Sequence, residues 1–178
     1  MNKAVSGKYT ILFIIGVGVA SAIGSQWYYH HLQQRPLALW GLGEANLMLN
    51  APLTNALLLV PVDKVPPGTL PAGEVRERIM VGKERWIVLK RKDVTNAPGF
   101  SHVRACLVDD ESFDWNTKGG DCQPQWIYGL EFNDVEAMVM VLFAPNCERA
   151  TLVDTGASAS MRPVMPGIVR FMKEQFPD

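Results

Sequence analysis

The sequence is poor in residues that bind transition metals, with 3 cysteines and 3 histidines among its 178 residues. Only His102 lies beyond the N-terminal third, and no Cys-x-x-C or His-x-x-x-His spacing occurs. These absences argue against a zinc site, a c-type haem site and a thioredoxin-type redox site. Gly41-Leu42-Gly43 lacks the remainder of a dinucleotide-binding fingerprint. We therefore expect no cofactor and no metal.

The sequence also lacks an excess of charge of either sign: 17 Lys and Arg face 18 Asp and Glu, giving a net charge of -1. Nucleic-acid-binding proteins usually carry a clear basic excess, so nucleic acid is not an expected partner. The charges are nevertheless segregated into a basic and then an acidic segment. The simpler interpretation is that the two segments form two solvated faces. The more specific one is that the separated charges form a dipole to which a charged partner docks. The basic segment contains Arg76, Arg78, Lys83, Arg85, Lys90, Arg91 and Lys92, and the acidic one Asp109, Asp110, Glu111, Asp114, Asp121, Glu131, Asp134 and Glu136.

No charged residue occurs between Tyr9 and Tyr29. As a helix this segment would be about 31 Å long at a rise of about 1.5 Å per residue. That length matches a hydrocarbon core of about 30 Å, so the sequence predicts a transmembrane helix at 9–29. Lys3 and Lys8 precede it without an acidic residue, which predicts a cytoplasmic tail at 1–8. The aromatic residues expected at the far interface of the cytoplasmic (inner) membrane are Trp27, Tyr28 and Tyr29.

A cleaved signal peptide is the competing interpretation, because Ala20-Ser21-Ala22 has the form of a cleavage site. Retention as a signal-anchor is favoured, since the apolar stretch continues past this site and ends in the aromatic cluster. Gly16, Ala20 and Gly24 have the small-x-x-x-small spacing that lets membrane helices approach closely. This spacing hints at a helical partner in the membrane.

The segment 30–53 is predicted to be juxtamembrane and amphipathic. Pro36 suits the first position of a second helix that ends near Leu49. Glu44 and Asn46 make this helix a poor membrane span. Three alternatives stay open: the helix lies on the membrane, against a partner or on the folded domain.

Residues 54–178 are predicted to form an extracytoplasmic (periplasmic) α+β domain. Apolar runs and turn signals indicate strands at 56–62, 85–90, 126–132, 137–143 and 150–153, and helices at 96–108 and 166–176. Asn133-Asp134 between two of the strands is typical of a hairpin. This order predicts a mainly antiparallel sheet with helices covering one face.

The residues 152–158, Leu-Val-Asp-Thr-Gly-Ala-Ser, resemble the active-site box of retropepsin-type aspartic proteases. That resemblance implies an Asp, here Asp154, that shares a proton with a second Asp across a dimer. The family's fold needs a flap and several strands after the box, whereas a loop and a helix are expected here. We therefore favour an ordinary Asp-Thr-Gly turn at the end of a strand.

Three cysteines allow one intramolecular disulfide with one thiol left over. An extracytoplasmic domain is a compartment in which disulfides persist. Cys106 with Cys122 is the preferred pair, and Cys147 is the alternative partner. A catalytic thiol lacks a convincing base, because His102 is the only His in the domain.

These features favour a non-catalytic accessory or assembly subunit of a larger membrane protein complex, an energy-transducing complex being one case. Its expected partners are membrane lipid and other membrane-protein subunits. The alternatives are a membrane-anchored aspartic-type hydrolase and a periplasmic ligand-binding module with a pocket lined by Trp86 or Trp126. Candidate docking residues are Trp40, Arg76, Arg78, Arg85, Lys90, Arg91 and Lys92.

Overall fold

The structure is a computed structural model that describes residues 7–32, 34–65, 78–117 and 122–177. Strands in these ranges form one curled sheet of seven strands in the order β2-β3-β1-β4-β5-β6-β7. Every neighbouring pair is antiparallel. The strands are β1 Leu53–Pro61, β2 Arg78–Val81, β3 Glu84–Asp93, β4 Tyr128–Asn133, β5 Met138–Ala144, β6 Arg149–Leu152 and β7 Ser158–Ser160.

The predicted α+β class with an antiparallel sheet is confirmed. Five strands coincide with the predicted segments, and the hairpin between β4 and β5 closes through a hydrogen bond from Asp134 N to Ala137 O of 2.8 Å. Two short strands, β2 and β7, were not predicted. They have 4 and 3 residues, too few for a periodic pattern to mark a strand by itself.

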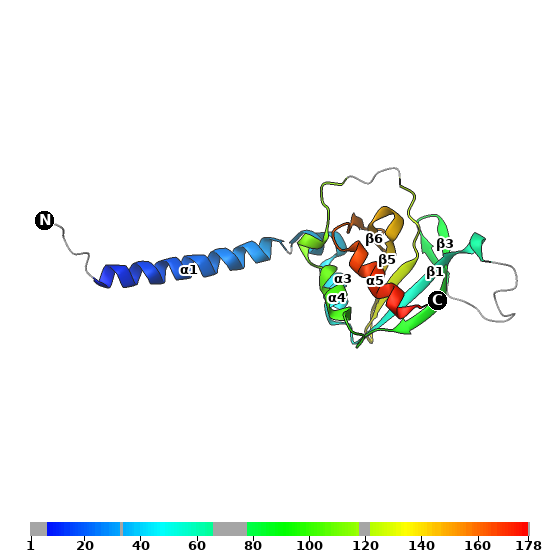
Figure 1. Cartoon of the computed structure of the whole chain (residues 1–178), viewed down its shortest axis with the longest axis horizontal. Helices are drawn as coiled ribbons and strands as arrows, with labels where there is room; N and C mark the ends of the chain where they lie inside the picture. The colour runs from blue at the N-terminus through cyan, green and yellow to red at the C-terminus, as the bar shows by residue number, and fades with distance from the viewer. Residues whose placement is uncertain (1–6, 33, 66–77, 118–121, 178) are drawn as a thin grey trace.

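Five α-helices accompany the sheet in the described ranges: α1 Gly7–Leu32, α2 Gln34–Trp40, α3 Leu42–Asn50, α4 Phe100–Cys106 and α5 Met165–Gln175. Helix α1 contains one window, Ile11–Tyr28, that is long and apolar enough to cross a membrane, and none of that window is buried inside the protein. Figure 1 shows α1 projecting away from the domain as a single rod. The predicted cytoplasmic tail lies outside the described residues except for Gly7 and Lys8.

The segment expected to form one juxtamembrane helix forms two, α2 and α3. Gly41 separates them with a φ of 96°, a backbone conformation that glycine adopts without the strain of a side chain. Both helices pack on the domain, which is one of the three alternatives that the sequence left open. Trp40, Ala45 and Met48 lie in its main hydrophobic core.

The sheet carries hydrophobic clusters on both faces. The larger cluster joins buried residues of α2 to α5 to residues from the centre of the sheet, such as Leu130, Phe132 and Val141. The smaller one lies on the other face and includes Leu57, Trp86 and other apolar residues from β1, β3 and β5. Because side chains alternate along a strand, adjacent residues of the same strand contribute to opposite clusters.

A single arginine fixes the corner at which α3 passes into β1. Arg104 on α4 donates from its guanidinium to the carbonyls of Leu49 and Ala51, each at 3.0 Å, and to Thr54 Oγ1 at 2.9 Å. The same guanidinium lies 4.8 Å from the centre of the Phe100 ring, a cation–π arrangement. Burial lowers the pKa of Arg104, but an arginine remains charged at neutral pH.

Trp40 contributes more to this packing than apolar area. Its side chain is 1% exposed, its Nε1 donates to Leu107 O at 2.7 Å, and its ring lies 5.9 Å from that of Phe113.

Trp40→Phe should lower the free energy of unfolding by about 1–3 kcal/mol, because the buried Leu107 carbonyl loses its partner. The measurement is chemical denaturation of the full chain in detergent. Trp27→Phe on the exposed surface of α1 is the control, and equal effects of the two changes would contradict this account.

Candidate functional site

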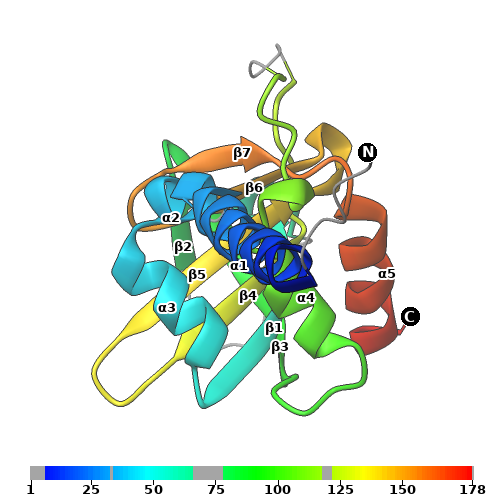
Figure 2. The same ribbon diagram turned by 90° about the vertical axis from the view of Figure 1, so that its left-hand side faces the viewer.

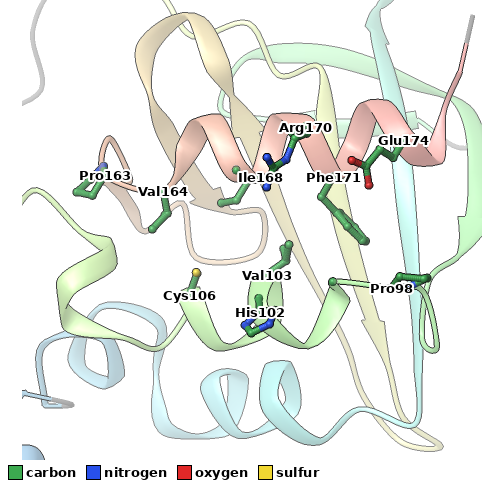
Figure 3. Close-up of a pocket in the computed structure, with 12 residues that line it drawn as sticks. Pro98, His102, Val103, Cys106, Pro163, Val164, Ile168, Arg170, Phe171 and Glu174 are labelled. Carbon is green, nitrogen blue, oxygen red and sulfur yellow. The ribbon is translucent and has the colours of Figure 1, made fainter.

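A groove of about 480 Å³ lies between α4 and α5. Val103, Ile168 and Phe171 are buried and form its apolar floor. His102, Arg170 and Glu174 are exposed at its rim. Figure 3 shows side chains from both helices along this groove, with the Cys106 sulfur pointing into the space between them.

The groove brings a thiol and an imidazole together on one helix, because Cys106 and His102 are four residues apart on α4. Within the described residues, however, no hydrogen bond or ion pair involves the side chain of His102, Cys106, Arg170 or Glu174. A nucleophile needs a base within hydrogen-bond reach to be activated. The groove is therefore an apolar hollow with a half-buried free thiol, and its described residues do not form an assembled catalytic pair.

The structure corrects the predicted disulfide. Cys122 is bonded to Cys147, with their Cα atoms 5.9 Å apart, and Cys106 is free. The turn η3, Pro145–Cys147, follows β5 and lies beside the chain that leads into β4. Asn146 joins the two segments through hydrogen bonds to Gln123 O and from Gln125 N, each at 2.9 Å. Cys106 lies on α4 and faces α5, so it is not placed to bond Cys122.

Asp154 lies at the turn between β6 and β7, as the turn interpretation of its Asp-Thr-Gly segment predicts. The turn closes through Leu152 N to Ala157 O at 2.8 Å and Gly156 N to Leu152 O at 2.9 Å, and Gly156 has a φ of 71°. Asp154 is exposed, and no residue in the described part of the chain hydrogen-bonds to its carboxylate. It lines a hollow of about 430 Å³ together with Glu44 and Asp134.

A third hollow, of about 300 Å³, is lined by Trp86, one of the two tryptophans expected in a ligand pocket. Its rim carries charges of both signs, from Asp63, Lys64, Glu84 and Arg85. Trp86 is 3% exposed, and its buried Nε1 has no hydrogen-bond partner among the residues that the structure describes. Trp126 lies in the same hydrophobic cluster as Trp86 but does not line this hollow.

The candidate docking residues differ in their exposure to solvent. Arg78, Arg85, Lys90 and Lys92 are exposed on β2 and β3, whereas Arg76 lies outside the described residues. The prediction that Trp40 is a docking residue is wrong. Its indole is buried in the core and bonded to Leu107 O, so a partner cannot reach it. At the expected membrane interface Trp27 and Tyr28 are exposed on α1, and the side chain of Tyr29 is outside what the structure describes.

A buried carboxylate that sequence reasoning missed lies on the smaller-cluster face of the sheet. Glu131 is 4% exposed and accepts from Arg91 Nη2 at 2.7 Å, Asn133 Nδ2 at 2.8 Å and Asn55 Nδ2 at 3.0 Å. The sequence feature that could have revealed it is a charged residue between the apolar Leu130 and Phe132. Because side chains alternate along a strand, Glu131 points to the other face of the sheet from these two residues. The charge of Arg91 is thereby already paired within the domain.

No group of three or more His, Cys, Asp or Glu side chains in the described residues could hold a metal ion. No known family model, no curated protein and no solved structure matches this chain.

The disulfide assignment gives a measurable thiol count. The folded chain should contain one free thiol, and Cys106→Ser should remove it with little effect on stability. Cys122→Ser or Cys147→Ser should expose a second thiol and lower the free energy of unfolding by about 2–4 kcal/mol, because the unfolded chain loses its cross-link. Titration with a thiol reagent and denaturant unfolding measure the two effects. A reactive thiol that persists in Cys106→Ser would show that the pairing is wrong.

Proposed function

We propose that this chain is a non-catalytic accessory or assembly subunit of a larger membrane protein complex, an energy-transducing complex being one case. In this proposal α1 spans the cytoplasmic membrane, the N-terminus lies inside, and the domain faces the extracytoplasmic space. The observation that carries it is α1 itself. None of its apolar window is buried inside the protein, whereas an equally apolar helix of a soluble domain would be buried in the core.

The attachment of α1 to the domain supports the same proposal. Helix α1 ends at Leu32 and α2 begins at Gln34, so one residue separates the membrane helix from an element of the core. A partner that contacts α1 in the membrane would therefore hold the domain in a restricted position. Such coupling suits a subunit that positions or stabilises others more than an enzyme on a flexible tether.

The disulfide and the site chemistry point in the same direction. The Cys122–Cys147 bond is typical of an oxidising compartment, which supports an extracytoplasmic domain. The hollows of the described residues contain no nucleophile paired with a base and no metal-binding cluster. Association with other subunits requires neither.

The small residues of α1 supply the test. Gly16, Ala20 and Gly24 are spaced by four residues and share one side of the helix, whereas Gly18 lies nearly opposite. A Cβ added at Gly16, Gly18 or Gly24 meets nothing within 4 Å, so larger residues fit in the isolated chain.

Gly16→Leu combined with Gly24→Leu should reduce the partner protein that co-purifies after mild detergent extraction by about tenfold or more, because close helix approach is blocked. Gly18→Leu is the matched control: it also makes α1 more apolar but leaves the small-residue side intact. The readout is quantitative mass spectrometry of the captured proteins, normalised to this chain. A wild-type chain that elutes alone, or three chains with the same partners in equal amounts, would contradict the proposal.

The hollow at Trp86 favours a second candidate function, a periplasmic ligand-binding module. Its volume is at the lower end of ligand pockets, and its mixed rim charges suit a small zwitterion. Free amino acids should then raise the unfolding temperature of the chain, and Arg85→Ala should abolish the increase. Lys90→Ala, an exposed cation of β3 outside the hollow, is the control. An unfolding temperature that no amino acid changes would remove this candidate.

A further inference from the structure

Residues 34–50, which form α2 and α3 and are called here the α2–α3 elbow, have an inner and an outer side. Trp40, Ala45 and Met48 on the inner side are buried in the core. On the outer side Leu42 is 74% exposed and Leu49 is 39% exposed. These leucines are seven residues apart, two turns along α3, so they share one side of the helix. The elbow thus presents apolar side chains that the domain leaves uncovered.

The elbow lies at the end of the domain from which α1 departs. Figure 1 shows α3 and α4 at the α1 end and β1 and β3 at the far end. In Figure 2, with α1 directed toward the viewer, α2 and α3 lie on the near side of the sheet. Whatever surface α1 enters is therefore the surface that α2 and α3 approach.

The length of chain between the apolar window and the elbow decides what can cover it. The window ends at Tyr28 and α2 begins at Gln34, six residues later. Six residues would span about 9 Å if all of them continued a helix at about 1.5 Å each. The headgroup layer extends about 5–7 Å beyond the hydrocarbon core, so only a few ångströms remain between it and the start of α2. Another protein helix has a diameter of about 10 Å and does not fit in this gap.

The composition of the elbow agrees with a lipid neighbour. Arg35 and Glu44 are its only charged residues, and its other outward side chains include Ala38, Asn46 and the two leucines. Arg35 is exposed at the start of α2, closest to α1, where a guanidinium can hydrogen-bond to lipid phosphate. Segments with leucine outward and few charges lie in the interface between headgroups and acyl chains.

We propose that the α2–α3 elbow rests on the outer surface of the phospholipid bilayer, with Leu42 and Leu49 in contact with lipid. This inference depends on the anchoring of α1 but not on the identity of any partner subunit. It fixes the orientation of the domain: the helices α2 and α3 face the membrane, and β2 and β3 face away from it. The exposed cations of β3 and the hollow at Trp86 then lie on the side reached by soluble molecules.

The test places one fluorescent label at a time on the full chain reconstituted in phosphatidylcholine and phosphatidylglycerol vesicles. The background is Cys106→Ser, in which the remaining cysteines are bonded to each other. Leu42→Cys probes the elbow. Met80→Cys on β2 is the matched control, because it is also apolar and 51% exposed. Ile15→Cys reports whether α1 is inserted. Spin-labelled lipids and aqueous iodide quench the fluorophore from the two sides.

The expected result is lipid quenching at Leu42→Cys that exceeds that at Met80→Cys by about threefold or more, with weaker quenching by iodide. Lipid quenching at Ile15→Cys, with equally strong iodide quenching and no lipid quenching at the other two sites, would overturn this inference. The membrane insertion of α1 would then still hold. Aqueous behaviour at all three sites would overturn both. The co-purification experiment with the α1 variants is independent, because these vesicles contain no partner subunit.

Discussion

The burial of Trp40 in the core ties the N-terminal helices to the rest of the domain. Its indole bonds Leu107 O and packs near Phe113, so α2 is held against α4 and the chain that follows it. The apolar helix α1 ends at Leu32, and α2 begins at Gln34. A short connection of this kind leaves a domain less freedom than a long flexible linker does.

Polar side chains also gather on the face of the sheet opposite the helices. The carboxylate of Glu131 and its three donors lie on the face of the sheet opposite the helices, and the hollow at Trp86 opens beside β3. A buried carboxylate is tolerated there because each of its three partners donates a hydrogen bond and one of them, Arg91, is charged. On the helical side, the groove between α4 and α5 offers apolar surface with a free thiol and no activated group.

Local pattern was sufficient for the long elements and insufficient for the short ones. Alternating or continuous apolar residues marked β1, β3, β4, β5 and β6, because each is long enough or apolar enough to reveal its period. Strand β7 is Ser-Ala-Ser, and nothing in these three residues distinguishes a strand from a loop; only pairing with β6 makes it one. The division of the second helix at Gly41 was missed for a similar reason, since a glycine in a helical pattern predicts neither a break nor its angle.

Composition and local pattern were enough to predict an apolar helix of membrane-spanning length, an α+β domain after it, and a turn at Asp154. These properties depend on composition and on residues close together in the chain. Only the tertiary structure decided that Cys122 pairs with Cys147, that Trp40 is buried, and that Glu131 gathers Arg91, Asn55 and Asn133. The cause is sequence separation: the Cys122–Cys147 bond, the bond from Trp40 to Leu107 and the bonds of Glu131 with Arg91 and Asn55 join residues 25 or more positions apart. Distances of that kind are set by how the sheet and helices pack, whereas Asn133 is two residues from Glu131 on the same strand.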